Sequence, residues 1–193
     1  KLWDLRIKNC VQTLKNHNKR VSAVCISPDS RMLVTGGEDG MAFSWDIKMC
    51  RPIFQYEVGS PVLSIDINTG GLMAAGCLDR AARVFDLNSP FNQIAKTKSD
   101  TMPVTSCVFY KTNYLFTAGT DNLKAWDLSS DEIIMTDNIE TSSKGILNMV
   151  VSDKINQIAF SSGTLSYHEC YLSDVNFEGP YSYIPPQNNS IYN

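Results

Sequence analysis

Short runs in which apolar and polar residues alternate recur along the chain, and turn-forming residues separate them. The first complete set is Val21–Ile26, Met32–Thr35, Met41–Ile47 and Ile53–Tyr56. A period of two places alternate side chains on opposite faces, which is typical of a β-strand. Connections of two to six residues join the runs. We therefore expect the four strands to form one antiparallel sheet.

The same order of four runs returns in the rest of the chain. The expected strands are Pro61–Ile67, Leu72–Ala75, Ala81–Leu87 and a weak one at Phe91–Ala95; then Val104–Tyr110, Tyr114–Thr117, Leu123–Leu128 and Glu132–Met135; and finally Ile146–Val151, Gln157–Ser161 and Leu165–Leu172. The last unit has no convincing fourth strand, and we expect its turn at residues 161–163. Before the first complete unit, Trp3 ends one strand and Cys10–Leu14 forms another, which predicts a partial unit.

One segment, Thr35–Asp46, shows the repeat most clearly. It contains a Gly-rich turn and ends in Trp45 followed by aspartate. The same aromatic–aspartate pair returns at Phe85 and Trp126, at spacings of 40 and 41 residues, and Trp3 precedes it by 42. A fixed period near 41 indicates supersecondary units that bury their faces against neighbouring units.

This pattern resembles a WD-repeat β-propeller. The resemblance implies an all-β fold, a propeller fragment of about four four-stranded antiparallel blades plus a partial blade. We expect the partial ring to occupy residues 1–175. Residues 176–193 are rich in Tyr, Pro and Asn and are expected to be a linker or disordered tail.

Composition excludes several classes of protein. The net charge of −3 is too small for a typical nucleic-acid binder, although residues 1–60 carry nine basic against six acidic residues. No apolar run is long enough for a membrane span. Six cysteines without a CxxC pair favour reduced thiols and an intracellular setting. Only two histidines are present, and we expect neither a metal site nor a cofactor.

Four residues invite comparison with a Ser/Thr–His–Asp catalytic set: His17, Thr35, Asp39 and Trp45. In the WD-repeat family these positions instead form a buried hydrogen-bond relay, so the resemblance implies a structural role. The later units keep parts of the relay. The retained residues are Asp79 in the second unit and Thr117, Asp121 and Trp126 in the third. We find no catalytic constellation and expect no enzyme.

Partners of propellers commonly dock on one rim, which the turns before each aspartate and the loops between blades form. The candidates for partner contacts here are Lys19, Arg20, Glu38, Leu78, Met102, Thr120 and Lys144.

Segments at both ends resemble one group within the family, the non-catalytic WD-repeat subunit of katanin. They are residues 1–11, 118–124 and 158–174, the last of which lacks the Trp-Asp pair. The resemblance implies a targeting module that directs a microtubule-severing complex to centrosomes or spindle poles, in the cytoplasm and on the cytoskeleton.

The expected partners of this targeting module are proteins bound through the rim, with microtubules or tubulin among the candidates. The severing ATPase would bind only through a helical domain that this chain does not contain, and neither nucleic acid nor membrane is expected. A basic face that includes Lys8, Lys15, Lys19 and Arg20 would suit acidic tubulin. The alternative is a generic WD-repeat adaptor, for example in a ubiquitin-ligase or trafficking assembly.

Overall fold

The computed structural model describes residues 1–89, 93–98, 100–120, 122–130, 133–140, 145–152, 157–164 and 167–174. Within these ranges every regular element is a β-strand, and every pairing between strands is antiparallel. The predicted all-β class is therefore confirmed.

Four consecutive sheets, here called blades 1 to 4, form the body of the molecule. Blade 1 contains β3 (Val21–Ile26), β4 (Met32–Gly37), β5 (Met41–Asp46) and β6 (Arg51–Glu57). Blade 2 contains β7 (Val62–Ile67), β8 (Leu72–Cys77), β9 (Ala82–Asp86) and β10 (Gln93–Lys96). Blade 3 contains β11 (Ser106–Tyr110), β12 (Tyr114–Ala118), β13 (Asn122–Asp127) and β14 (Ile134–Glu140), and blade 4 contains β15 (Ile146–Ser152), β16 (Gln157–Thr164) and β17 (Tyr167–Asp174). Each blade is a meander in which consecutive strands are neighbours. The repeat of about 41 residues is thus one meander per unit.

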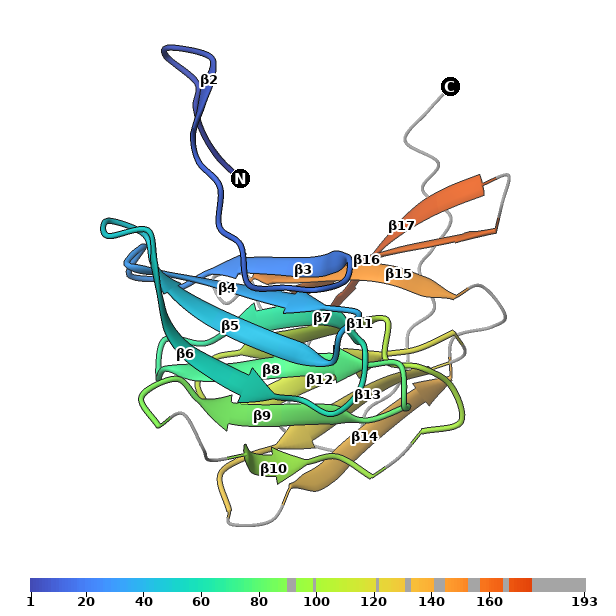
Figure 1. The fold of residues 1–193 in the computed structure, drawn as a ribbon. Coiled ribbons are helices and arrows are strands. Elements are labelled where there is room, and N and C mark those ends of the chain that lie inside the picture. Colours follow the sequence, from blue (N-terminus) through green and yellow to red (C-terminus); the bar gives the residue numbers. More distant parts are fainter. Residues whose placement is uncertain are drawn as a thin grey trace.

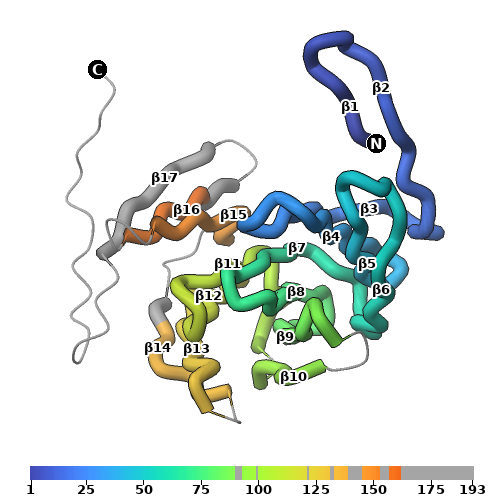
Figure 2. Tube along the Cα trace, turned by 90° about the vertical axis from the view of Figure 1, so that its left-hand side faces the viewer, coloured from blue at the N-terminus to red at the C-terminus, as the bar shows by residue number. Residues whose placement is uncertain are grey.

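The blades are arranged as part of a ring. Their first strands, β3, β7, β11 and β15, contact one another in sequence order, so each blade meets the next through its first strand. In Figure 1 these strands lie in the upper part of the body, with β3 and β15 along its top. In Figure 2 the sheets fan outward, with blade 1 and the strands β15 and β16 directed to opposite sides and blades 2 and 3 between them. This is the architecture of a WD-repeat propeller fragment.

A separate two-stranded sheet precedes blade 1. It pairs β1 (Leu2–Asp4) with β2 (Asn9–Gln12), and Figure 1 shows it standing away from the blades. Trp3 is 58% exposed, whereas Trp45 and Trp126 at the same place in their repeats are 3% exposed. The partial unit therefore has the predicted strand pair but not the burial of a complete blade.

The structure places two of the predicted elements differently. Residues 161–163 are not a turn, because β16 continues through them and its pairing with β17 extends to Thr164. The last strand of blade 3 lies further along the chain than predicted, at Ile134–Glu140, and β10 runs over Gln93–Lys96. Residues 91–92, 132 and 165, at the ends of predicted strands, and the predicted tail 176–193 lie outside the described residues.

The core consists of layers between successive blades. Val34 and Tyr56 of blade 1 pack against Ile65 and Ile67 of blade 2, and similar layers separate blades 2 and 3 and blades 3 and 4. Hydrogen bonds cross the same boundaries near the ring centre. The N–H of Cys107 donates to Ser64 Oγ at 3.1 Å, and the N–H of Met149 donates to the equivalent Ser106 Oγ at 3.1 Å.

Asp66 on β7 makes a third bond of this kind. Its Oδ2 accepts the N–H of Phe109 on β11 at 2.7 Å. Burial raises the pKa of this carboxyl, although the hydrogen bond from Phe109 opposes the shift. The inner strands are therefore held together by side-chain acceptors as well as by apolar packing.

Equivalent positions in the repeats show what a neighbouring blade does. Ile67 and Phe109 face the preceding blade and are 6% and 7% exposed. Ile26 occupies the same position in blade 1, opposite Leu33 as Ile67 is opposite Met73, and it is 57% exposed. The difference between these two isoleucines is the presence of a covering sheet.

These two isoleucines provide a matched test. We expect Ile67→Ala to lower the free energy of unfolding by about 2–5 kcal/mol, because it leaves a cavity between two blades. Ile26→Ala should change it by no more than about 0.5 kcal/mol, as for other exposed positions. Urea unfolding of both variants measures the difference. Equal losses would show that the layer between blades 1 and 2 is not a well-packed core.

Candidate functional site: the rim of the propeller

The relay side chains of blade 1 lie within hydrogen-bonding distance of one another. His17 Nδ1 is 3.0 Å from the Asp39 carboxylate and its Nε2 is 2.9 Å from Thr35 Oγ1, while Trp45 Nε1–H donates to the same hydroxyl at 3.0 Å. An ionised carboxylate only accepts, so His17 Nδ1–H donates to Asp39, while the Thr35 hydroxyl bonds both His17 Nε2 and Trp45. Every polar side-chain atom in this set of bonds then has at least one partner.

Asp39 also fixes the backbone around it. Its carboxylate accepts the N–H of Asn18 at 3.0 Å and the N–H of Met41 at 3.2 Å. Burial favours the neutral acid, but the bonds from His17 and these N–H groups outweigh it and lower the pKa of Asp39. The relay therefore joins the segment before β3 to the turn between β4 and β5. Its histidine and aspartate side chains are only 6% and 4% exposed, which leaves no access for a substrate.

Blade 2 contains an ion pair where blade 1 has the relay. Ala75 and Phe85 replace Thr and Trp, and Asp79 binds Arg83, whose Nη1 donates to Oδ1 at 2.9 Å. The Arg83 side chain is 8% exposed. This guanidinium lowers the pKa of Asp79, against a smaller opposing effect of burial. Asp79 thus anchors its turn, but through a partner that the relay pattern does not contain.

Blade 3 has both a Trp–Thr hydrogen bond like that of blade 1 and an ion pair like that of blade 2. Trp126 Nε1–H donates to Thr117 Oγ1 at 2.8 Å, as in blade 1. The ammonium of Lys124 lies 3.0 Å from Asp100, with side chains 14% and 8% exposed, and the Asn122 amide donates to Asp100 at 3.1 Å. Burial opposes ionisation of Asp100, but Lys124 and Asn122 outweigh it and lower its pKa. Asp121, the predicted relay member, lies outside the described residues.

The two cations occupy one position of the repeat. In the strand pairing, Arg83 lies opposite Ala75 and Lys124 lies opposite Thr117, as Phe43 lies opposite Thr35 in blade 1. In blade 1 the Phe43 ring meets the His17 ring edge-on at 4.7 Å. Sequence reasoning missed this substitution, although a cation two residues before the aromatic–aspartate pair is a visible signal.

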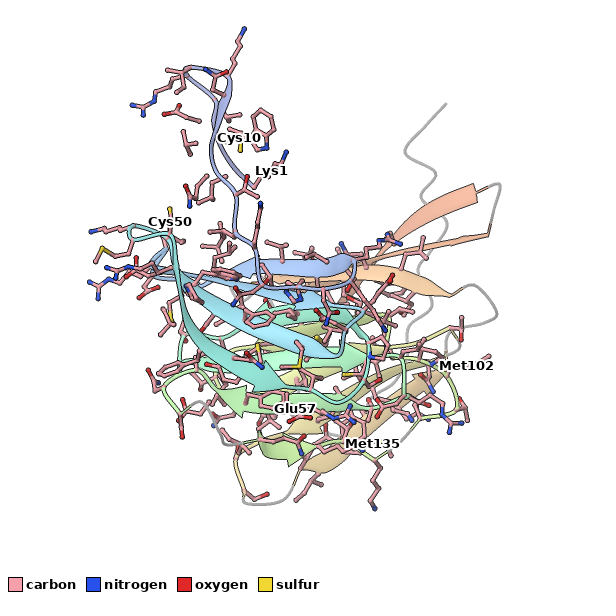
Figure 3. All side chains as sticks on the ribbon, in the orientation of Figure 1. Lys1, Cys10, Cys50, Glu57, Met102 and Met135 are labelled. Carbon is pink, nitrogen blue, oxygen red and sulfur yellow. The ribbon has the colours of Figure 1, made fainter. Side chains whose placement is uncertain are left out.

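The rim comprises the turns 38–40, 78–80 and 118–120 and the segments 17–20, 58–61 and 100–104. Hydrogen bonds join turn and segment, for example from the N–H of Glu38 to the Arg20 carbonyl at 2.9 Å and from the N–H of Leu78 to the Pro61 carbonyl at 3.0 Å. Figure 3 shows Met102 at one edge of the body and Cys50 at the opposite edge.

The predicted contact residues differ in accessibility. Lys19 and Arg20 are exposed, and the Arg20 guanidinium lies 3.7 Å from Glu38 in a solvated ion pair. Leu78 and Met102 are 49% and 41% exposed. Thr120 is half-buried, and its hydroxyl is buried with no hydrogen-bond partner among the described residues, so it offers little to a partner. Lys144 lies outside the described residues.

The part of the chain that the structure describes holds no group of three or more potential metal-ligating side chains. It contains no helix with the length and apolar character of a membrane span. Burial raises the pKa of the Cys77 thiol to about 11 and that of Cys107 to about 12, so these thiols are poor nucleophiles at neutral pH.

The meander blades, the relay and the aromatic–aspartate repeat define the class of fold as a WD-repeat β-propeller fragment. Comparison with known proteins agrees. Residues 8–46 match the model of the family "WD domain, G-beta repeat".

Two curated plant relatives are similar over more than half of the chain. Protein SPA1-RELATED 3 of Arabidopsis thaliana is 29% identical over 132 residues, which is 66% of this chain and 16% of the relative. Pre-mRNA-processing factor 19 of Oryza sativa subsp. japonica is 30% identical over 125 residues, 62% of this chain and 24% of the relative. The chain thus spans about a quarter or less of these two proteins.

Among solved structures, the crystal structure of the computationally designed Ika4 protein has a similar fold. The TM-score is 0.69 at 16% sequence identity, over 85% of this chain and 96% of the designed one. At this identity the similarity concerns the fold alone.

The relay residues are predicted to act in stability. Asp39→Ala should lower the free energy of unfolding by about 1–3 kcal/mol, because it removes the acceptor for buried donors. Glu38→Ala at the adjacent, more exposed position should change it by no more than about 0.5 kcal/mol. Urea unfolding of the two variants tests this, and equal effects would refute the structural role.

The blade 2 ion pair should make stability depend on pH. Because the folded pKa of Asp79 lies below its ordinary value of 3.8, its ionised form stabilises the fold above that value, and the contribution is lost as pH falls through the folded pKa. Asp79→Asn should therefore be most destabilising near neutral pH and least below pH 3.8. In an Arg83→Met background this pH dependence of the loss should disappear. A loss that stays constant in acid would contradict the ion-pair mechanism.

Proposed function

We propose that this chain is a non-enzymatic WD-repeat interaction module that binds a protein partner through its rim. The observation that carries the proposal is that the buried polar groups of the rim are bonded within the protein. His17, Asp39, Arg83 and Lys124 are all engaged in internal bonds that hold the turns in place. What remains for an outside molecule is a rigid edge with exposed side chains.

The comparisons support a generic module. The two relatives described above carry names that refer to unlike contexts, one of them the processing of pre-mRNA. Similarity to both is expected if the shared part is a scaffold for interactions and not the specific activity of either protein. WD domains are generally non-catalytic scaffolds, which also favours this reading.

A narrower proposal is targeting to microtubules as part of a katanin-type complex. The names of the relatives described above mention neither katanin nor microtubules. The observation in its favour is a set of exposed basic residues near the N-terminus, namely Lys8, Lys15, Lys19 and Arg20. Cytoskeletal and cytoplasmic location belong to this narrower proposal.

Site-specific photo-crosslinking tests the interaction module. A photoreactive amino acid placed at Thr101 on the rim should give a discrete adduct in cells, because this side chain is exposed between two blades. The matched position is Lys48, which is exposed in the turn beside Cys50 at the opposite edge. The adduct protein, once identified and purified, should bind the purified chain in calorimetry. The same adducts from both edges, or none from the rim, would contradict rim docking.

Co-sedimentation with stabilised microtubules tests the narrower proposal. Binding of the complete chain should weaken between low and high salt, since charge attraction is screened over about 8 Å at physiological ionic strength. Reversal of charge at Lys19 and Arg20 should weaken it at low salt, with Arg51→Glu, at an exposed position outside the rim, as the control. Binding that ignores both changes would remove the basic-face mechanism, and no binding would leave the generic module.

A further inference from the structure

Two exposed apolar side chains lie on adjoining rim segments between blades 2 and 3. The N–H of Asp100 donates to the Arg80 carbonyl at 2.6 Å, and the N–H of Val104 donates to the Cys77 carbonyl at 3.1 Å. These bonds bracket Leu78 on one segment and Met102 on the other. We call this pair of side chains the apolar ledge.

The ledge is local to this part of the rim. Leu78 directly precedes the turn aspartate, and the same position holds Glu38 in blade 1 and Thr120 in blade 3. Elsewhere the described rim presents Lys19 and Arg20. Methionine and arginine, which this part of the rim presents at Met102 and Arg80, are enriched at protein interfaces relative to the rest of the surface.

Ion pairs hold both segments of the ledge. Arg83 binds Asp79, next to Leu78, and Lys124 binds Asp100, two residues before Met102. A side chain presented on a fixed backbone loses less conformational freedom on binding than one on a mobile loop. The ledge is therefore pre-organised for a partner.

The charge around the ledge is positive. Asp79 and Asp100 are neutralised by their internal cations, whereas Arg80 and Lys98 are exposed and have no carboxylate at ion-pair distance within the described ranges. An acidic partner segment would complement this surplus.

Arg80 stands at a position that suits glycine. Its φ is +70°, and the equivalent residue of the blade 1 turn is Gly40, with a φ of +75°. A left-handed backbone disfavours a residue with a Cβ atom, so the arginine is kept at a cost in stability. Four other non-glycine residues within the described ranges also have a positive φ, so this conformation is common in the turns of the chain.

We propose that the apolar ledge, with Arg80 and Lys98 beside it, binds an extended segment of another protein that carries apolar side chains flanked by acidic ones. This inference rests on the proposed rim-docking function and names the partner chemistry of one part of the rim. Met and Leu would receive the apolar side chains, and the two cations would pair with the acidic ones.

The test is a selection from a random dodecapeptide display library on the immobilised complete chain. Enriched peptides should combine Asp or Glu with Leu, Ile, Met or Phe. Titrated by fluorescence anisotropy, an enriched peptide should bind about five- to tenfold more weakly to Leu78→Ala or Met102→Ala, the loss expected when a half-buried apolar contact is removed. Met49→Ala, an exposed methionine in the turn beside Cys50, is the matched control and should bind normally.

Arg80→Gly separates binding from folding. It removes a cation and relieves the backbone, so it should weaken peptide binding at low salt without lowering the melting temperature. Peptides that bind the wild type and both ledge variants equally would overturn the ledge while leaving rim docking in place. The ledge would also be overturned if basic peptides are enriched or if no peptide is enriched. Self-association of the chain that covers Leu78 and Met102 at the concentrations used would overturn it too. Rim docking itself is judged separately, by the crosslinking at Thr101.

Discussion

The blades carry apolar side chains on the faces that they turn toward one another, so each of these faces needs a neighbouring sheet. The requirement explains why the structure is a series of layers, with the core divided among the boundaries between blades. It also explains the contrast between Ile67 and Ile26, which share a repeat position and differ only in what covers them. The serine acceptors at Ser64 and Ser106 fix the spacing of the same boundaries near the centre of the ring.

On the rim the blades meet one demand by different chemistry. A turn and an adjoining segment have to be joined, and buried polar atoms have to be satisfied. Blade 1 uses His17 between Asp39 and the Thr35 hydroxyl, whereas blades 2 and 3 use the cations Arg83 and Lys124. The choice affects what the outer surface presents, because the paired aspartates contribute little charge and leave the exposed cations to determine its sign.

The sequence predicts the blades well because alternation and the aromatic–aspartate repeat are local signals. Strand β3 was predicted with the observed bounds, Val21–Ile26. The position of β14 and the length of β16 were not predicted, since pairing with a neighbouring strand decides where such strands end. The ion pair of Lys124 with Asp100 joins residues 24 positions apart on different segments. No local sequence pattern identifies Asp100 as the partner of Lys124. The relay members of blade 1 could be named because the resemblance supplies their spacing.

The replacement of the relay by ion pairs constrains how this chain can change. A histidine introduced before β7 would find Ala75 in place of a hydroxyl and Asp79 already engaged by Arg83. Each single step toward a relay in blade 2 would thus leave a buried charge or donor without its partner, at a cost of about 1–3 kcal/mol. The substitutions are mutually dependent, so the effect of any one of them depends on which others are present. The blades share one repeat pattern, but the buried polar residues of one blade cannot be exchanged singly for those of another.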